Sequence, residues 1–270
     1  MKKYVFLILI AGIAGGMAIM SCSSSSSPTT TTTITNQFAL TVGNKFQFSL
    51  VINDTSGNPI QADQKSIHET VVANALTFAG VSNVYMCIDT VFNATGSFDL
   101  MDTILYATNG TYLLQYGFVT WAIDVYTGGG LQAPPKWDTI AKIGSSAWIA
   151  DTTNNVHSDI TAGSTVVPVL ENYLLNGADN GATSVTVGSN SYSADQSKLN
   201  GSLTGTGTYS GLPIGLSATL QATIDVTYNP TIPASIVTPI VSVPITLAGS
   251  AYETLKYGGY SRTMTSYSAQ

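Results

Sequence analysis

Charged side chains are scarce in this sequence. Only 9% of its 270 residues are Asp, Glu, Lys or Arg, whereas an average soluble domain contains about 25%. The balance is acidic, with a formal net charge of −6. Nucleic acids and other polyanions are bound by basic surfaces, so the composition argues against nucleic acid as a partner.

Catalytic motifs are also lacking. His68-Glu69 begins like the zinc-protease motif HExxH, but Val72 stands where the second His is required. The sequence contains neither a G-x-S-x-G nucleophile turn nor a G-x-x-x-x-G-K phosphate loop. Asp99 and Asp102 lie close together, but near a turn, where Asp often caps the backbone. We therefore expect no catalytic residue, no metal ion and no cofactor, and a protein that is not an enzyme; a hydrolase remains an alternative.

The chain has two cysteines, and Cys22 is the informative one. Lys2 and Lys3 form a basic start, Tyr4–Met20 is uncharged and mostly apolar, and Ser21 precedes Cys22. This pattern resembles the lipobox of bacterial lipoproteins, in which the chain is cut before the cysteine and the thiol is joined to diacylglycerol. The alternative is an uncleaved transmembrane anchor, but 17 residues are at the lower limit for spanning a bilayer.

We therefore predict a lipoprotein signal peptide at 1–21, a lipidated Cys22 with a Ser/Thr-rich tether at 22–37, and one β-rich domain at 38–270. The tether is expected to be a flexible spacer, because it has too few apolar residues to fold. Loss of Lys2 and Lys3 would leave seven basic against fifteen acidic residues, a net charge of −8. With Cys22 acylated, Cys87 has no disulfide partner and is expected to be buried.

Alternating and β-branched segments predict a chain of antiparallel strands. Asn109-Gly110 is typical of a type I′ turn that joins two strands into a hairpin. Asp54–Pro59 is a dense turn cluster after the first strand. Pro230, Pro233, Pro239 and Pro244 are expected to place 232–246 in an edge strand or a loop. The predicted strands are 46–53, 66–77, 84–91, 103–108, 111–116, 121–126, 164–175, 184–187, 198–209, 216–228 and 262–267.

Several segments together resemble a group of uncharacterised secreted lipoproteins from the Bacteroidetes–Chlorobi branch of bacteria. The resemblance implies an outline similar to the lipoprotein-carrier fold, which is a single curved antiparallel sheet forming an incomplete β-barrel around an apolar groove; a β-sandwich is the alternative. Thr231–Ala234 departs from the group, whose members often have a Gly-Ile-Gly turn there. The segments that carry the resemblance are 42–46, 54–59, 109–112, 115–117, 134–138, 147–148, 186–194, 259–262 and 265–267.

Aromatic side chains gather around the central strands, where they either pack in the core or line a concave site for a lipid, another apolar ligand or a glycan. Gln115 could then orient a ligand. The candidate lining residues are Tyr106, Tyr112, Tyr116, Trp121, Trp137 and Trp148.

We expect a non-enzymatic envelope protein that the N-terminal lipid holds at the outer membrane, facing the periplasm. It would bind an apolar ligand or lipid in a groove of the sheet. The alternative is a structural or fimbrial-type surface subunit, which would have a removable or donated strand and would polymerise. A sheet that curves around an apolar cavity favours the first hypothesis, and a flat pairing of two sheets favours the second.

Overall fold

A computed structural model describes residues 37–127, 133–162 and 165–269. They belong to one compact unit, Asn36–Gln270. The predicted signal peptide (1–21), the predicted lipidation site Cys22 and all of the predicted tether except Gln37 lie outside the described residues.

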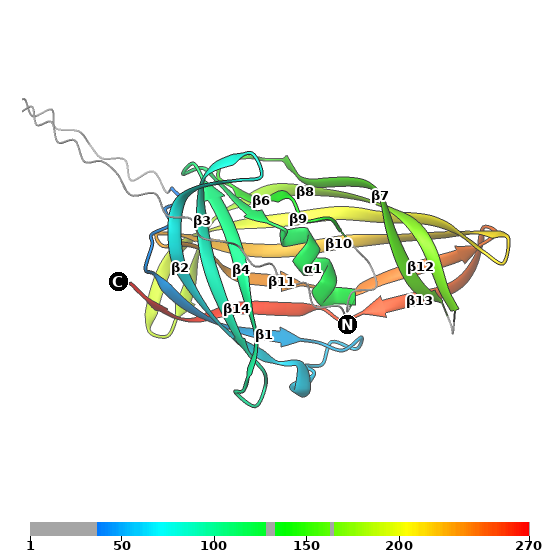
Figure 1. Cartoon of the computed structure of the whole chain (residues 1–270), viewed down its shortest axis with the longest axis horizontal. Coiled ribbons are helices and arrows are strands. Elements are labelled where there is room, and N and C mark those ends of the chain that lie inside the picture. Colours follow the sequence, from blue (N-terminus) through cyan, green and yellow to red (C-terminus); the bar gives the residue numbers. More distant parts are fainter. Residues whose placement is uncertain (1–36, 128–132, 163–164, 270) are drawn as a thin grey trace, which may run out of the picture. The chain divides into compact units, whose positions relative to one another are not determined.

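The described part of the chain is built almost entirely from strands, which Figure 1 labels along the chain. The elements before the helix are β1 (Lys45–Ile52), η1 (Gln61–Asp63), β2 (Lys65–Phe78), β3 (Val81–Phe92), β4 (Phe98–Thr108) and β5 (Tyr112–Tyr116). The helix α1 (Phe118–Thr127) is followed by β6 (Trp137–Lys142), β7 (Trp148–Ala162), β8 (Thr165–Val187), β9 (Asn190–Tyr209) and β10 (Leu212–Tyr228). The last strands are β11 (Thr231–Thr238), β12 (Val241–Leu247), β13 (Ser250–Tyr257) and β14 (Tyr260–Ser268). No helix in the described ranges is long and apolar enough to cross a membrane.

All fourteen strands form one antiparallel sheet. The order is β6-β5-β4-β3-β2-β1-β14-β11-β10-β9-β8-β7, and β12 and β13 branch from β10. The two end strands, β6 and β7, approach each other without forming a strand pair, so the sheet is nearly closed into a barrel with one seam. This confirms the predicted single curved sheet.

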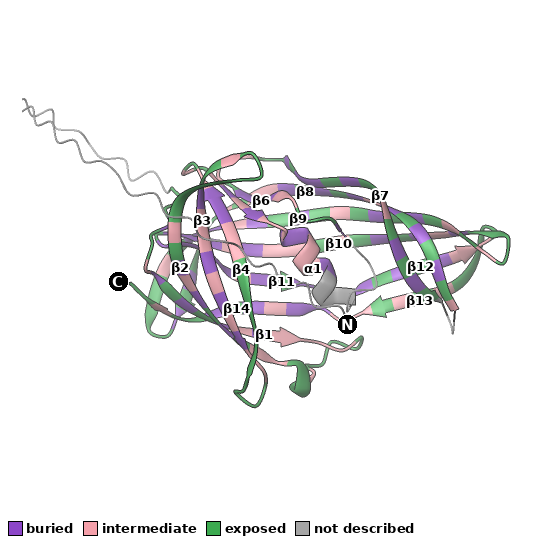
Figure 2. Ribbon diagram, in the orientation of Figure 1, coloured by how far each residue is buried: buried purple, intermediate pink, exposed green. Residues whose placement is uncertain are grey.

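Buried and exposed residues alternate along many of the strands, as the bands of colour show (Figure 2). Phe46, Phe48 and Leu50 of β1 are buried, whereas Lys45 and Gln47, at the alternate positions, are exposed. Successive residues of a strand point to opposite faces, so a sheet with one buried face has this pattern. The buried side chains form a single hydrophobic core.

The predicted hairpins are confirmed, with one change of turn type. β1 pairs with β2, and β4 pairs with β5 through Thr108↔Leu113. Gly110 has a φ of +93°, but Asn109 is not among the described residues with positive φ, and a type I′ turn requires positive φ at both. Instead, the Asn109 side-chain oxygen accepts the N–H of Thr111 at 3.0 Å. The prediction of type I′ was wrong because this side-chain hydrogen bond holds an alternative turn.

The predicted strand at 121–126 is wrong, because this segment belongs to helix α1. The N–H of Gly117 donates to the carbonyl of Lys136, and the N–H of Val119 donates to Asp138 Oδ2 at 2.9 Å. The Asp138 carboxylate on β6 thus satisfies a free N–H at the start of the helix. Tertiary contacts from a strand far along the chain therefore override the local preference of this aromatic and β-branched segment for strand.

Two strand predictions in the second half also need correction. The segments 164–175 and 184–187 are parts of one 23-residue strand, β8. Neither β11 nor β12 is an edge strand, because β11 lies between β10 and β14 and β12 pairs with both β10 and β13. Pro233 sits beside a shift of register between β10 and β11, and such a bulge accommodates a residue that cannot donate to the ladder.

Candidate functional site

The interior of the sheet contains an unusual number of charged side chains for a chain with so few. Buried charged groups require partners because transfer from water is costly. Seven are buried among the described residues, namely Glu69, Asp89, Asp138, Asp151, Glu171, Asp195 and Arg262.

The central cluster consists of Glu69, Asp89 and Arg262. Glu69 on β2 lies directly opposite Asp89 on β3. Arg262 on β14 donates from Nη2 to Glu69 Oε2 at 2.8 Å and from Nη1 to the carbonyl of Pro233 at 3.1 Å. Its guanidinium carbon lies 3.4 Å from the centre of the Phe48 ring. Ion pairing, hydrogen bonding and a cation–π contact therefore hold the guanidinium inside the barrel.

Burial controls the ionisation of this cluster. It raises the pKa of Asp89 to about 9, and the neighbouring Glu69 adds to the rise. Burial also raises the pKa of Glu69, and the positive charge of Arg262 opposes that rise. Because Arg262 pairs directly with Glu69, Asp89 is the member of this carboxyl pair that keeps its proton. Burial also raises the pKa of the Cys87 thiol well above its usual value, which keeps this cysteine unreactive.

A small cavity adjoins the cluster. Its volume is about 20 Å³, which is room for one water molecule or a group of similar size. Asp89 Oδ1 and Gln115 Oε1 are buried without a hydrogen-bond partner. The cavity is lined by Ile67, Asp89, Ile104, Tyr106, Gln115, Trp121, Ile236 and Arg262. Four of these residues are polar and four are apolar, so the cavity combines unused polar atoms with an apolar side.

Helix α1 forms one side of this cavity. Trp121 projects from α1 and packs edge-on against Tyr260 of β14, with ring centroids 5.2 Å apart. Phe118, Val119 and Ile123 of the same helix are buried in the core. The helix thus covers part of the interior with apolar side chains.

A second polar cluster connects the seam to the helix. Lys136, just before β6, forms an ion pair with Asp151 of β7 and donates to the carbonyl of Thr152 at 2.5 Å. Burial raises the pKa of Asp138 to about 7; the Val119 N–H opposes this rise, and Asp151 adds to it. These polar contacts therefore link β6, β7 and the start of α1.

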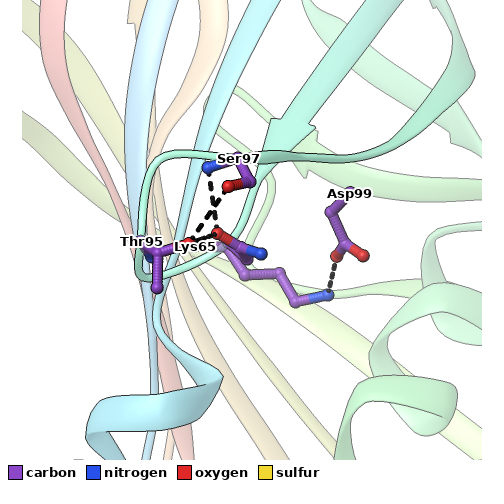
Figure 3. A network of polar contacts seen from close by, with 5 residues as sticks. Lys65, Thr95, Ser97 and Asp99 are labelled. Atoms are coloured by element: carbon purple, nitrogen blue, oxygen red, sulfur yellow. Dashed lines mark hydrogen bonds and ion pairs between the residues drawn. The ribbon is translucent and has the colours of Figure 1, made fainter.

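A surface ion pair gives a contrast to these buried groups. Lys65 Nζ lies 2.6 Å from Asp99 Oδ2, beside the turn in which Thr95 and Ser97 donate to Asn93 (Figure 3). Both charged side chains are partly exposed, and exposed pairs contribute only about 0–1 kcal/mol.

The buried carboxyls predict a protein that is more stable in mild acid. Burial raises the pKa of Asp195 to about 7, and the neighbouring Asp179 adds to the rise; the pKa of Asp138 is raised to a similar value. Carboxyls in an unfolded chain titrate near pH 4, so between about pH 4 and pH 7 the native state binds more protons than the unfolded state. The melting temperature should therefore fall as the pH rises from 5 to 8.

Thermal unfolding of the full chain across this pH range tests the prediction. Asp138→Asn should reduce the slope, because its amide oxygen still accepts the Val119 N–H and it has no proton to lose. Asp63→Asn, at an exposed residue of η1, is the matched control and should retain the slope. A melting temperature that rises between pH 5 and pH 8 would contradict the assignment.

The six aromatic candidates do not lie at one place. Tyr106 and Trp121 line the cavity. Tyr116 and Trp137 pack together with Phe78, and the Trp137 indole donates to the Phe78 carbonyl. Trp148 is buried at the seam, where its indole donates to the carbonyl of Thr139 at 2.9 Å. Tyr112 is half-buried, opposite Lys142.

Sequence reasoning missed the Glu69–Asp89–Arg262 cluster, although it singled out Gln115. A signal was present, because each charged residue occupies an inward position of its strand. Glu69 lies between Ile67 and Val71, Asp89 between Cys87 and Val91, and Arg262 between Tyr260 and Met264. A charged residue whose neighbours two positions before and two positions after it are buried faces the interior of the sheet. Such a residue indicates a buried partner.

Groups of three or more His, Cys, Asp or Glu residues that could hold a metal ion do not occur within the described ranges. No protein-family model matches the chain, and no curated protein matches it.

Two solved structures are similar to the chain. One is of a candidate lipoprotein from Parabacteroides distasonis, with 11% identity and a TM-score of 0.47, covering 86% of this chain and 97% of that one. The other is of a candidate exported protein with a YmcC-like fold from Bacteroides fragilis, with 6% identity and a TM-score of 0.39, covering 86% of this chain and 99% of that one.

Proposed function

We propose that this protein is a lipid-anchored, non-enzymatic protein of the outer membrane whose domain faces the periplasm and binds an apolar ligand with a small polar head. The observation that carries the ligand proposal is a buried amide oxygen without a partner, Gln115 Oε1, which lies beside Asp89 at a cavity whose wall is about half apolar. Buried polar atoms of native proteins nearly always have partners. A ligand head supplies such a partner.

The size and charge of the cavity favour a neutral head. A volume of about 20 Å³ matches a single hydroxyl group. Arg262 is already paired with Glu69, so it offers little to a carboxylate, and the adjacent Glu69 would repel one. Glu69 and the buried acid Asp89 lie beside the positive Arg262, which would in turn repel an amine. A hydroxyl both donates and accepts, so it can serve Gln115 and Asp89 together.

The body of the ligand needs more space than this cavity provides. The apolar wall consists of Ile67, Ile104, Ile236 and Trp121. Trp121 belongs to α1, which begins directly after Gly117. Gly117 has a φ of +72°, in the left-handed region. Because the side chain of Trp121 fills part of this space, a bound ligand would displace α1 from the interior. The ligand body would then take the place of the apolar side chains of the helix.

Gln115→Leu separates this function from stability. The change keeps a side chain of similar length and removes the unpartnered amide, so the ligand-free fold should be retained or stabilised by about 1 kcal/mol. It should also remove the head contact. In the full chain in mild detergent, 1-dodecanol should raise the melting temperature of the wild type, as ligands of the native state do. It should have little effect on Gln115→Leu, and dodecanoate should be weaker than dodecanol on the wild type.

Tyr116→Phe is the control, because Tyr116 lies on the same strand but does not line the cavity. It should respond to dodecanol like the wild type. Two results together would contradict the proposal. Neither compound would raise the melting temperature of the wild type in a saturable way, and solvent extraction would release the same molecules from the purified wild type and from Gln115→Leu. A larger rise in melting temperature with dodecanoate than with dodecanol would contradict the inference of a neutral head but not the ligand proposal itself.

The anchor has its own test. Cys22→Ser should abolish incorporation of labelled fatty acid and leave uncut precursor, because the diacylglycerol has no thiol to join. Wild-type protein that carries no label, together with a Cys22→Ser product of the same mature size, would contradict lipidation.

A further inference from the structure

The outer face of strands β8, β9 and β10 has an uncharged area, which ends at Lys198 of β9 and borders Asp159 of β7. The three strands lie side by side in the sheet (Figure 1). We call this surface the β8–β10 face. Its members are Val166, Pro168, Leu170, Asn172, Leu174 and Asn176 of β8, Asn200, Ser202, Thr204, Thr206 and Thr208 of β9, and Pro213, Gly215, Ser217, Thr219 and Gln221 of β10.

An apolar row runs along β8 within this face. Val166 is 60% exposed, Leu170 37% and Leu174 43%. The neighbouring row on β9 is polar but uncharged, with Thr206 opposite Leu170 and Ser202 opposite Leu174. Only Asn172 interrupts the row, and exposed apolar side chains that lie close together within a polar border indicate an interaction surface.

The chemistry of the face fits a second copy of the same chain. The protein is acidic overall, so two copies repel each other wherever their carboxylates meet. The residues of the β8–β10 face carry no carboxylate, and the exposed Asp159 of β7 lies only at its border, opposite Pro168. The row is also self-complementary about Asn172, because a two-fold axis there sets Leu170 of one copy against Leu174 of the other. Self-complementarity of one patch is what a two-fold symmetric dimer requires.

We infer that the β8–β10 face joins two copies in a weak, symmetric dimer. Strand spacings give the face an area of about 500 Å², hence about 1,000 Å² buried in total, which is near the lower limit for a specific contact. A weak contact of this size suits copies that are concentrated on one membrane, where tethering raises the effective concentration. The face itself does not depend on the anchor, nor on the ligand site inside the barrel.

Disulfide cross-linking of the full chain in intact cells tests this inference. The pair Leu170→Cys plus Leu174→Cys should give a cross-linked dimer after brief oxidation. The two positions are about 13 Å apart along one strand, too far to bridge within a chain. Leu170→Cys alone should cross-link at least several-fold less, because the axis sets each copy's position 170 against position 174 of the other.

Two further variants keep the result interpretable. Gln47→Cys, at an exposed side chain of β1, should give only the background of random collisions. Thr204→Glu, opposite Asn172 on β9, added to the double variant should abolish cross-linking, because it places like charges beside the axis at an exposed position. Cross-linking that equals the Gln47→Cys level, that persists with Thr204→Glu, or that extends to a ladder of larger species would overturn the dimer; the ladder would indicate polymerisation instead.

Discussion

Replacing Arg262 with methionine is expected to destabilise the domain by about 3–5 kcal/mol, the usual effect of removing one partner of a buried ion pair. Glu69 is fully buried, so it would lose its counter-ion without gaining water. The carbonyl of Pro233 and the face of the Phe48 ring would lose their contacts with the guanidinium as well. Methionine fills most of the space, so the loss is mainly electrostatic. Denaturant unfolding of the full chain measures the effect.

Two comparisons identify the cause. Lys65→Met breaks the surface pair with Asp99, which is partly exposed, and should cost no more than about 1 kcal/mol. The double variant Glu69→Gln plus Arg262→Met should recover a substantial part of the loss, because the uncompensated charge is gone. If the double variant is no more stable than Arg262→Met, the loss comes from packing rather than from the buried carboxylate.

Trp148→Ala is the second large effect, also about 3–5 kcal/mol, as for other buried aromatic side chains. Trp148 is 9% exposed and donates its indole N–H to the Thr139 carbonyl across the seam. Its ring fills the space over Gly177 of β8, where a Cβ has no room. Removing the ring leaves a cavity at the junction of β6, β7 and β8. Thermal unfolding should show the loss, and hydrogen exchange should be faster in β6.

Gly177→Ala tests the same contact from the other side. The added methyl would displace the indole, so this variant should destabilise the fold as well, and its effect should not add fully to that of Trp148→Ala. Gly215→Ala is the control for Gly177→Ala, since its Cβ would meet only the Thr246 hydroxyl, at 3.0 Å. Gly188 is less suitable as a control because its φ is positive. Equal stability of wild type and Trp148→Ala would show that the seam closes without this residue.

Much of the strand content was predictable from local pattern. Phe46, Phe48 and Leu50 alternate with exposed residues, and this alternation predicts both the strand and its buried face. The Asp54–Pro59 cluster forms a turn because the Asp54 carboxylate accepts the N–H groups of Ser56 and Asn58. These features depend on residues within a few positions of each other, so the sequence carries them directly.

The candidate site was not predictable in the same way. Glu69 and Arg262 are separated by 193 positions in the chain, and only the pairing of β1 with both β2 and β14 brings them together. Asp138 lies in a strand after α1, yet it caps the start of that helix. Pairing between distant strands sets these contacts, and local propensity contains no information about it.

The sequence by itself determined that this chain forms antiparallel strands with one apolar face, and where most of its turns lie, because both depend on side-chain alternation and on residues close together. Only the tertiary structure decided that 118–127 is a helix, that Pro233 lies in an inner strand, and that charged residues meet inside a nearly closed barrel. The reason is physical: a buried charge or an unusual backbone is stable only when distant residues supply its partner.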